Sequence, residues 1–106
     1  MQTPLRITFR HVDSSRAIEA RVRDLTDRLE RFHDRIIGCR VVIEAPPGHS
    51  GKGGPFAVKI EVTVPGGAIN VNSAHAPHPE HADVYVALRD AFDAVTRQLQ
   101  AYAPVH

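Results

Sequence analysis

Cysteine, tryptophan and long apolar runs are scarce or absent in this sequence of 106 residues. Cys39 has no second cysteine to pair with, so an internal disulfide is excluded and a reducing compartment is expected. No stretch is long and apolar enough to cross a bilayer. The N-terminal segment MQTPLRITFRH carries arginines within its apolar part, which is not typical of a signal peptide. We therefore expect a cytoplasmic protein with no membrane partner.

Motifs of common catalytic sites are also missing. There is no nucleophile elbow, no paired acidic motif and no Gly-x-Gly-x-x-Gly. The segment GHSGKGG has the composition of a phosphate-binding loop, but two residues instead of four separate Gly48 from Gly51, and a strand follows it. We therefore predict no enzyme activity, no cofactor and no small-molecule substrate.

Seven histidines invite a metal-binding interpretation. His75, His78 and His81 form an H-x-x-H-x-x-H pattern whose imidazoles are candidate ligands for zinc or nickel. Pro77 and Pro79 keep this segment extended, and no thiolate lies near it in the sequence. We predict no metal site and expect a solvated loop that gains charge below neutral pH. For Cys39, which stands among β-branched residues, we expect a buried thiol and not a nucleophile.

Periodicity predicts an α+β domain with the element order β-α-β-β-β-α over residues 1–106. Apolar residues alternate with polar ones in 4–10 and 56–64, which is typical of half-buried strands. Residues 39–44 and 68–72 complete the strands, and Pro65-Gly66-Gly67 provides a hairpin turn. The first helix should begin after Asp13 or Ser14 and stop at Gly38. Its apolar stripe contains Ile18, Val22, Leu25, Leu29 and Phe32.

The second helix should begin at Asp83 and end at Pro104, with a stripe that includes Leu88, Val95 and Tyr102. Each helix has one apolar stripe and each clear strand one apolar face. We therefore expect both helices on one side of a four-stranded mixed sheet. The other side would expose polar residues: Arg6, Thr8, Arg10, Arg40, Lys59, Glu61, Asn70 and Asn72. No aromatic is in phase with them, so base stacking on the sheet is not expected.

The formal charge is only +1, so any nucleic-acid site must come from a local concentration of basic residues. At 3.6 residues per turn, Arg21, Arg28 and Arg35 fall on one flank of the first helix. Arg31 lies close to this flank, and Asp24 lies within it. Guanidinium groups in a row suit a phosphate backbone. Ordinary helical ion pairs such as Asp24–Arg28 or Asp27–Arg31 explain the same spacing equally well.

Several segments occur in order along nearly the whole chain and resemble one known family. They are MQ and ITFR, LERFHDRI, CRVVIE, FAVKIEVTVPGGAINVN, and DVYVALRDAFDAVTRQL. The last has the pattern D-x-Y-x-A-[IL]-x-D-A-x-D followed by RQL. The chain resembles the short form of the ribosome hibernation-promoting factors, also called ribosome-associated inhibitors or the sigma-54 modulation family. This resemblance implies a fold akin to a double-stranded-RNA-binding domain.

The resemblance also implies a function and a partner. Family members bind 16S rRNA of the small ribosomal subunit under stress and occupy the channel for mRNA and tRNA, which inhibits translation. Arg28, Arg35 and Arg97 match basic family positions, and the helix geometry adds Arg21, Arg31 and Arg89 to the expected RNA-binding residues.

The second helix departs from the family pattern. Ala94, Ala101 and Ala103 stand where lysines are common. Residues 83–102 carry two arginines and three aspartates, a net charge of −1. We therefore expect weaker RNA binding than the family pattern implies, carried mostly by the first helix. We also expect no C-terminal domain of the kind by which long members dimerise ribosomes.

Two other functions stay open. One is a protein-interaction module on the same fold, with weak RNA affinity, that uses the polar sheet face or an edge strand to form a homodimer or to bind another protein. The other is a metal-binding stress protein that uses the histidine loop.

Overall fold

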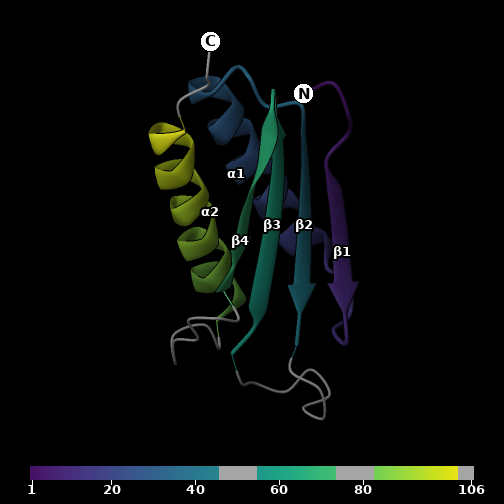
Figure 1. The fold of residues 1–106 in the computed structure, drawn as a ribbon. Coiled ribbons are helices and arrows are strands. Elements are labelled where there is room, and N and C mark those ends of the chain that lie inside the picture. The colour runs from purple at the N-terminus through teal and green to yellow at the C-terminus, as the bar shows by residue number, and fades with distance from the viewer. Residues whose placement is uncertain (46–54, 74–82, 103–106) are drawn as a thin grey trace.

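The computed structural model describes residues 1–45, 55–73 and 83–102 (Figure 1). Their elements follow the predicted order β-α-β-β-β-α. The bounds are β1 (Arg6–Arg10), α1 (Arg16–Phe32), β2 (Gly38–Glu44), β3 (Ala57–Val64), β4 (Gly67–Asn72) and α2 (Val84–Ala101).

The strands form one mixed sheet in the spatial order β1-β2-β3-β4. β1 pairs with β2 in parallel, and the other neighbouring pairs are antiparallel. Figure 1 shows that α1 and α2 cover the same side of this sheet and run in similar directions. α1 is the crossover between the parallel strands β1 and β2, whereas β2, β3 and β4 form a meander. The predicted two-layer fold is therefore confirmed.

The hydrophobic core lies between the sheet and the helices. Alternate residues of β2 and β3 point toward the helices, and both helices bury their apolar stripes against them. The largest side chains with almost no exposure are Val22, Val41, Ile43, Val58, Ile60, Val62, Leu88 and Val95. Removing this apolar surface from water is the main term that stabilises the fold.

Both helices begin at a side chain that caps free backbone N–H groups. Asp83 caps α2 as predicted, because its Oδ1 accepts a hydrogen bond from the Tyr85 N–H at 2.9 Å. The prediction for α1 was wrong by one or two residues. The cap is Ser15, whose backbone is extended and whose Oγ accepts from the Ile18 N–H at 3.3 Å.

The end of α1 also differs from the prediction. The helix ends at Phe32, where His33 adopts an extended backbone, and Gly38 is already the first residue of β2. Gly38 therefore has a packing role and is not the helix stop. A Cβ added to it would lie 2.3 Å from the Thr3 Oγ1, and Thr3 donates a hydrogen bond to the Ile37 carbonyl at 3.0 Å. The glycine lets the N-terminal segment pass close to β2.

The β3–β4 turn is tied to the end of α2. Gly66 has φ +85°, a conformation that side-chain-bearing residues rarely adopt. The Tyr102 hydroxyl donates a hydrogen bond to the Pro65 carbonyl at 2.9 Å. Tyr102 is thus the residue that ends α2, and it links the last turn of the helix to the hairpin.

Cys39 is buried, as predicted, with 5% of its surface exposed. Burial raises the pKa of its thiol from 9.0 to about 11, because desolvation penalises the thiolate. The nearby Thr26 hydroxyl lowers this pKa, and the negative charge of Glu30 raises it further. The thiol is therefore protonated and shielded at physiological pH.

Some predictions fall outside the described residues. They concern the histidine loop, with His75, His78 and His81. The prediction that the second helix ends at Pro104 was wrong, because α2 ends at Ala101 and Tyr102 already has an extended backbone. Among the residues that the structure does describe, no group of three or more metal-ligating side chains comes together. No helix in the described part of the chain has the length and apolar character needed to cross a membrane.

Candidate nucleic-acid interface

A groove of about 600 Å³ runs between α1 and α2. Its walls come from both helices: Leu25, Arg28, Leu29, Phe32 and His33 on one side, and Phe92, Asp93, Thr96 and Gln100 on the other. We call it the interhelical groove. Four of its lining residues are apolar, namely Leu25, Leu29, Phe32 and Phe92, whereas the other residues that α2 contributes are polar.

A second cavity of about 420 Å³ adjoins this groove where α1 ends. We call it the end cavity. It shares Phe32 and His33 with the groove, and it is completed by Asp34, Arg35, Ile36, Val64, Pro65, Leu99 and Tyr102. The groove and the end cavity therefore lie next to each other, with Phe32 and His33 at their common border, and we refer to the two together as the concave surface.

Two of the predicted arginines lie along α1 on the side of this groove. Arg28 lines the groove, and Arg21 lies two turns before it on the same flank. Asp24 lies between them and accepts from both guanidinium groups, at 3.2 Å from Arg21 Nη1 and 3.2 Å from Arg28 Nη2. The predicted Asp24–Arg28 ion pair is therefore confirmed. Arg21 and Arg28 therefore belong to the basic flank and also form the helical ion pairs with Asp24.

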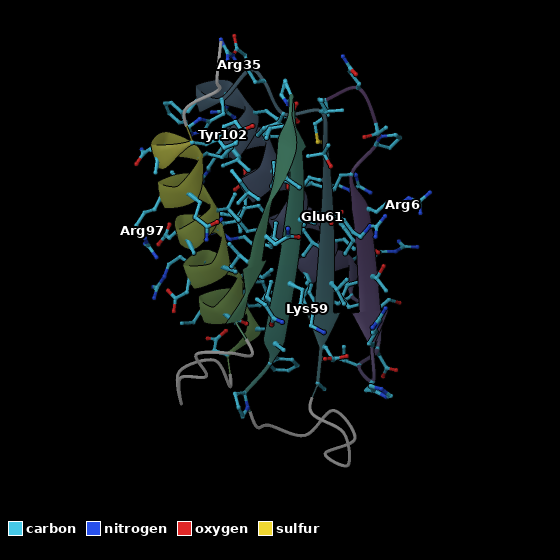
Figure 2. The ribbon with its side chains drawn as sticks, viewed as in Figure 1. Arg6, Arg35, Lys59, Glu61, Arg97 and Tyr102 are labelled. Carbon is cyan, nitrogen blue, oxygen red and sulfur yellow. The ribbon has the colours of Figure 1, made fainter. Side chains whose placement is uncertain are left out.

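Arg35 is not on the first helix, and this part of the prediction was wrong. α1 ends three residues earlier, so the seven-residue spacing that joined Arg35 to Arg21 and Arg28 does not continue. Arg35 instead lies in the turn after the helix, where it is exposed and lines the end cavity. In Figure 2 it lies at the same end of the molecule as Tyr102. The turn, not the helix, therefore places Arg35 on the concave surface beside the groove.

The other predicted arginines differ in their positions. Arg31 is exposed opposite the buried face of α1 and does not line the groove, and no ion pair between described residues includes it. The alternative Asp27–Arg31 pair is therefore not formed.

Arg89 lies four residues before Asp93, on the groove side of α2, and it pairs with Asp90 at 3.2 Å. Arg97 is exposed on the outward side of α2, away from the sheet (Figure 2).

The prediction that Phe32 belongs to the buried stripe of α1 was wrong. Its side chain is 80% exposed, although it lines both the groove and the end cavity. Phe32 is the last residue of α1, and most of the α2 residues that line the groove with it are polar, namely Asp93, Thr96 and Gln100. The polar character of these positions was the signal in the sequence that this part of α2 does not bury the ring.

The open face of the sheet is polar, as predicted. Arg6, Arg40 and Glu61 stand in register across three strands, and Lys59 Nζ lies 3.8 Å from Glu44 Oε1. Phe9 and Phe56 pack against the core on the other side. Within the described strands, no aromatic side chain therefore lies on the open face. Figure 2 shows Arg6, Lys59 and Glu61 on the strands far from the outer side of α2.

Two solved structures share this fold. The N-terminal domain of Protein Y from Thermus thermophilus superposes with a TM-score of 0.73 at 24% identity, over 97% of this chain and 100% of that one. A ribosomal subunit interface protein from Coxiella burnetii gives a TM-score of 0.73 at 20% identity, over 92% and 94% of the two chains. These structures share the fold of two helices on one face of a four-stranded sheet.

The sequence defines the family more directly. Residues 5–104 match the family described as Sigma 54 modulation protein / S30EA ribosomal protein, and the chain belongs to this family. The resemblance seen in the sequence motifs is thereby confirmed. A search of curated proteins finds no match to this sequence.

Proposed function

We propose that this protein is a ribosome-associated hibernation factor that binds 16S rRNA of the small subunit under stress and inhibits translation. Family membership and the likeness to a ribosomal subunit interface protein support association with the ribosome. Such a partner places the protein in the cytoplasm and requires no catalysis and no cofactor.

One observation carries the choice of RNA-binding surface. Arg28 and Arg35 line two adjoining cavities of the same concave surface, and Arg21 and Arg89 lie on the flanks that face the interhelical groove. Guanidinium groups spaced along a groove fit successive phosphates of an RNA strand. Arg31 and Arg97 lie outside the groove and would contact phosphates only at its margins.

The acidic residues set the expected strength of this interaction. Asp93 lines the groove and Asp24 occupies two of the arginines, so the groove has only a modest positive charge. Because affinity for RNA rises with the number of neutralised phosphates, binding should be moderate and sensitive to salt.

Co-sedimentation with purified ribosomal subunits tests the proposed function. The protein should pellet with small subunits and much less with large subunits, and the pelleted fraction should fall as KCl is raised from 50 to 200 mM. In a cell-free translation reaction, the same concentrations of protein should reduce synthesis. Pelleting that is equal for both subunits, or translation that is unaffected at saturating protein, would contradict the proposal.

The open sheet face favours one alternative, a protein-interaction module. Neither helix covers this face, and its row of Arg6, Arg40 and Glu61 combines both signs of charge. A face of this kind is complementary to another charged surface, including that of a second copy. Feeble, salt-insensitive pelleting together with a dimer in light scattering would favour this alternative.

A further inference from the structure

Phe32 is the most exposed large apolar side chain in the described part of the chain. It is 80% exposed, compared with 42% for Tyr85 and 39% for Met1. An apolar ring of this size gains free energy when an occupant covers it, because its surface is then removed from water. Phe32 is also common to the groove and the end cavity, so an occupant of either would contact it.

The charged neighbours of Phe32 define what kind of occupant fits. Arg28 lies one helical turn before the ring in the groove, and Arg35 lies beyond it in the end cavity. The acids on the same surface are Asp93 in the groove and Asp34 in the end cavity. Neither acid forms an ion pair with a described residue. An aromatic ring between two guanidinium groups matches a nucleotide, which offers a flat base next to a phosphate on either side.

Double-stranded RNA does not fit this arrangement. In a duplex the faces of the bases are stacked on one another, and only phosphates, sugars and groove edges are accessible. A protruding ring would meet the sugar-phosphate backbone and gain no stacking. An unpaired base, in contrast, has a free face that can lie on the ring while its phosphates reach the arginines.

We propose that Phe32 is a stacking platform for an unpaired base, with Arg28 and Arg35 holding the phosphates on either side of that base. The groove is thus specific for a single-stranded or bulged segment of RNA. This inference rests on the proposed function, because it assigns a class of RNA to the same groove.

The absence of tryptophan in the sequence provides a direct test. A Phe32→Trp variant has a single indole, and stacking on a base quenches indole fluorescence. A Thr8→Trp variant is the matched control, because Thr8 is exposed on the open face of the sheet, opposite the helices. Each variant is titrated with a 12-nucleotide single-stranded RNA and with a blunt duplex of the same sequence.

The inference predicts quenching only for Phe32→Trp with the single strand. Equal quenching of both variants, or quenching of Phe32→Trp by the duplex as strongly as by the single strand, would overturn it.

Binding measurements separate stacking from simple apolar contact. Phe32→Ala and Phe32→Leu should each bind the single strand about tenfold more weakly, while Phe32→Tyr keeps the affinity, because only an aromatic ring stacks. Full binding by Phe32→Leu would show that the ring is an apolar contact and would overturn the inference. Since the ring is exposed, all these variants should keep the thermal stability of the wild type, which is measured alongside.

The same variants distinguish failure of this inference from failure of the proposed function. If Phe32→Ala pellets with small subunits as well as the wild type does, stacking is wrong but ribosome binding stands. If the wild type does not pellet with small subunits, the proposed function is wrong. Capture of a ribosomal protein instead of rRNA at this ring, detected by cross-linking from the groove, would also overturn the assignment to RNA.

Discussion

Asp24 holds two arginines of the proposed RNA-binding surface, and replacing it separates their structural role from their role in binding. Its carboxylate is 3.2 Å from the guanidinium groups of both Arg21 and Arg28. The substitution Asp24→Asn removes the negative charge with little change in size. If the arginines serve to bind RNA, this change should strengthen binding. If they serve mainly to stabilise α1, it should only weaken the fold.

The structure gives the expected magnitudes. The Asp24 carboxylate is 44% exposed and its partners are 37% and 56% exposed, so solvent screens both ion pairs. Surface pairs of this kind contribute about 0–1 kcal/mol each, and the loss of stability should stay near the lower part of this range. Each arginine released to a phosphate of single-stranded RNA should steepen the salt dependence by about 0.7 in the logarithmic slope. Between 50 and 200 mM salt, that is roughly a threefold larger loss of affinity per contact.

The assay is binding to small ribosomal subunits at several KCl concentrations, combined with urea unfolding. Asp27→Asn is the matched control, because Asp27 is an exposed aspartate of α1 that forms no ion pair with a described residue. It makes the same change in net charge on the side of the helix away from the groove. Equal effects of Asp24→Asn and Asp27→Asn, or weaker binding by Asp24→Asn, would refute the reasoning.

Two further predictions concern stability. Because the pKa of Cys39 is raised from 9.0 to about 11, its protonated form contributes stability that is fully present below pH 9 and is lost as the pH rises through 11. The free energy of unfolding of the wild type should therefore fall by about 2 kcal/mol more than that of Cys39→Ala between pH 8.5 and 11; parallel curves would exclude this. Tyr102→Phe removes the hydrogen bond to the Pro65 carbonyl and should cost about 0.5–1.5 kcal/mol in urea unfolding, whereas an unchanged midpoint would mean that this bond contributes nothing.

The sequence predicts the fold well because two periodicities dominate it. Apolar and polar residues alternate in 56–64, and Val22 and Leu29 are spaced by two helical turns. These patterns predict which side of each element is buried, and the structure buries those sides. The family motifs agree with this assignment.

The ends of α1 were predicted poorly because end positions depend on local contacts. Ser15, Asp13 and Ser14 are all good caps, and only the backbone conformation selects among them. Glycine is common at helix ends, but the glycine at position 38 is explained by the close approach of Thr3. The error at Arg35 has the same origin, since it assumed that the helix continues. The error at Phe32 has another origin, because Phe32 does belong to α1 but most of the α2 residues that line the groove with it are polar.

The candidate site was therefore predictable in part. The spacing of Arg21 and Arg28 was sufficient to place them on one flank. The position of Arg35 depends on where α1 ends, and the exposure of Phe32 depends on which α2 residues line the groove with it. Both are properties of the tertiary structure.

The central claim is that the arginines beside the interhelical groove bind 16S rRNA, and a charge reversal measured by co-sedimentation tests it most directly. Arg28→Glu/Arg35→Glu is compared with Arg16→Glu/Arg23→Glu, which makes the same change in charge with exposed arginines on the opposite flank of α1. We expect the first variant to lose pelleting with small subunits at 50 mM KCl and the second to retain it. Unchanged pelleting of Arg28→Glu/Arg35→Glu, or equal loss in both variants, would contradict the claim.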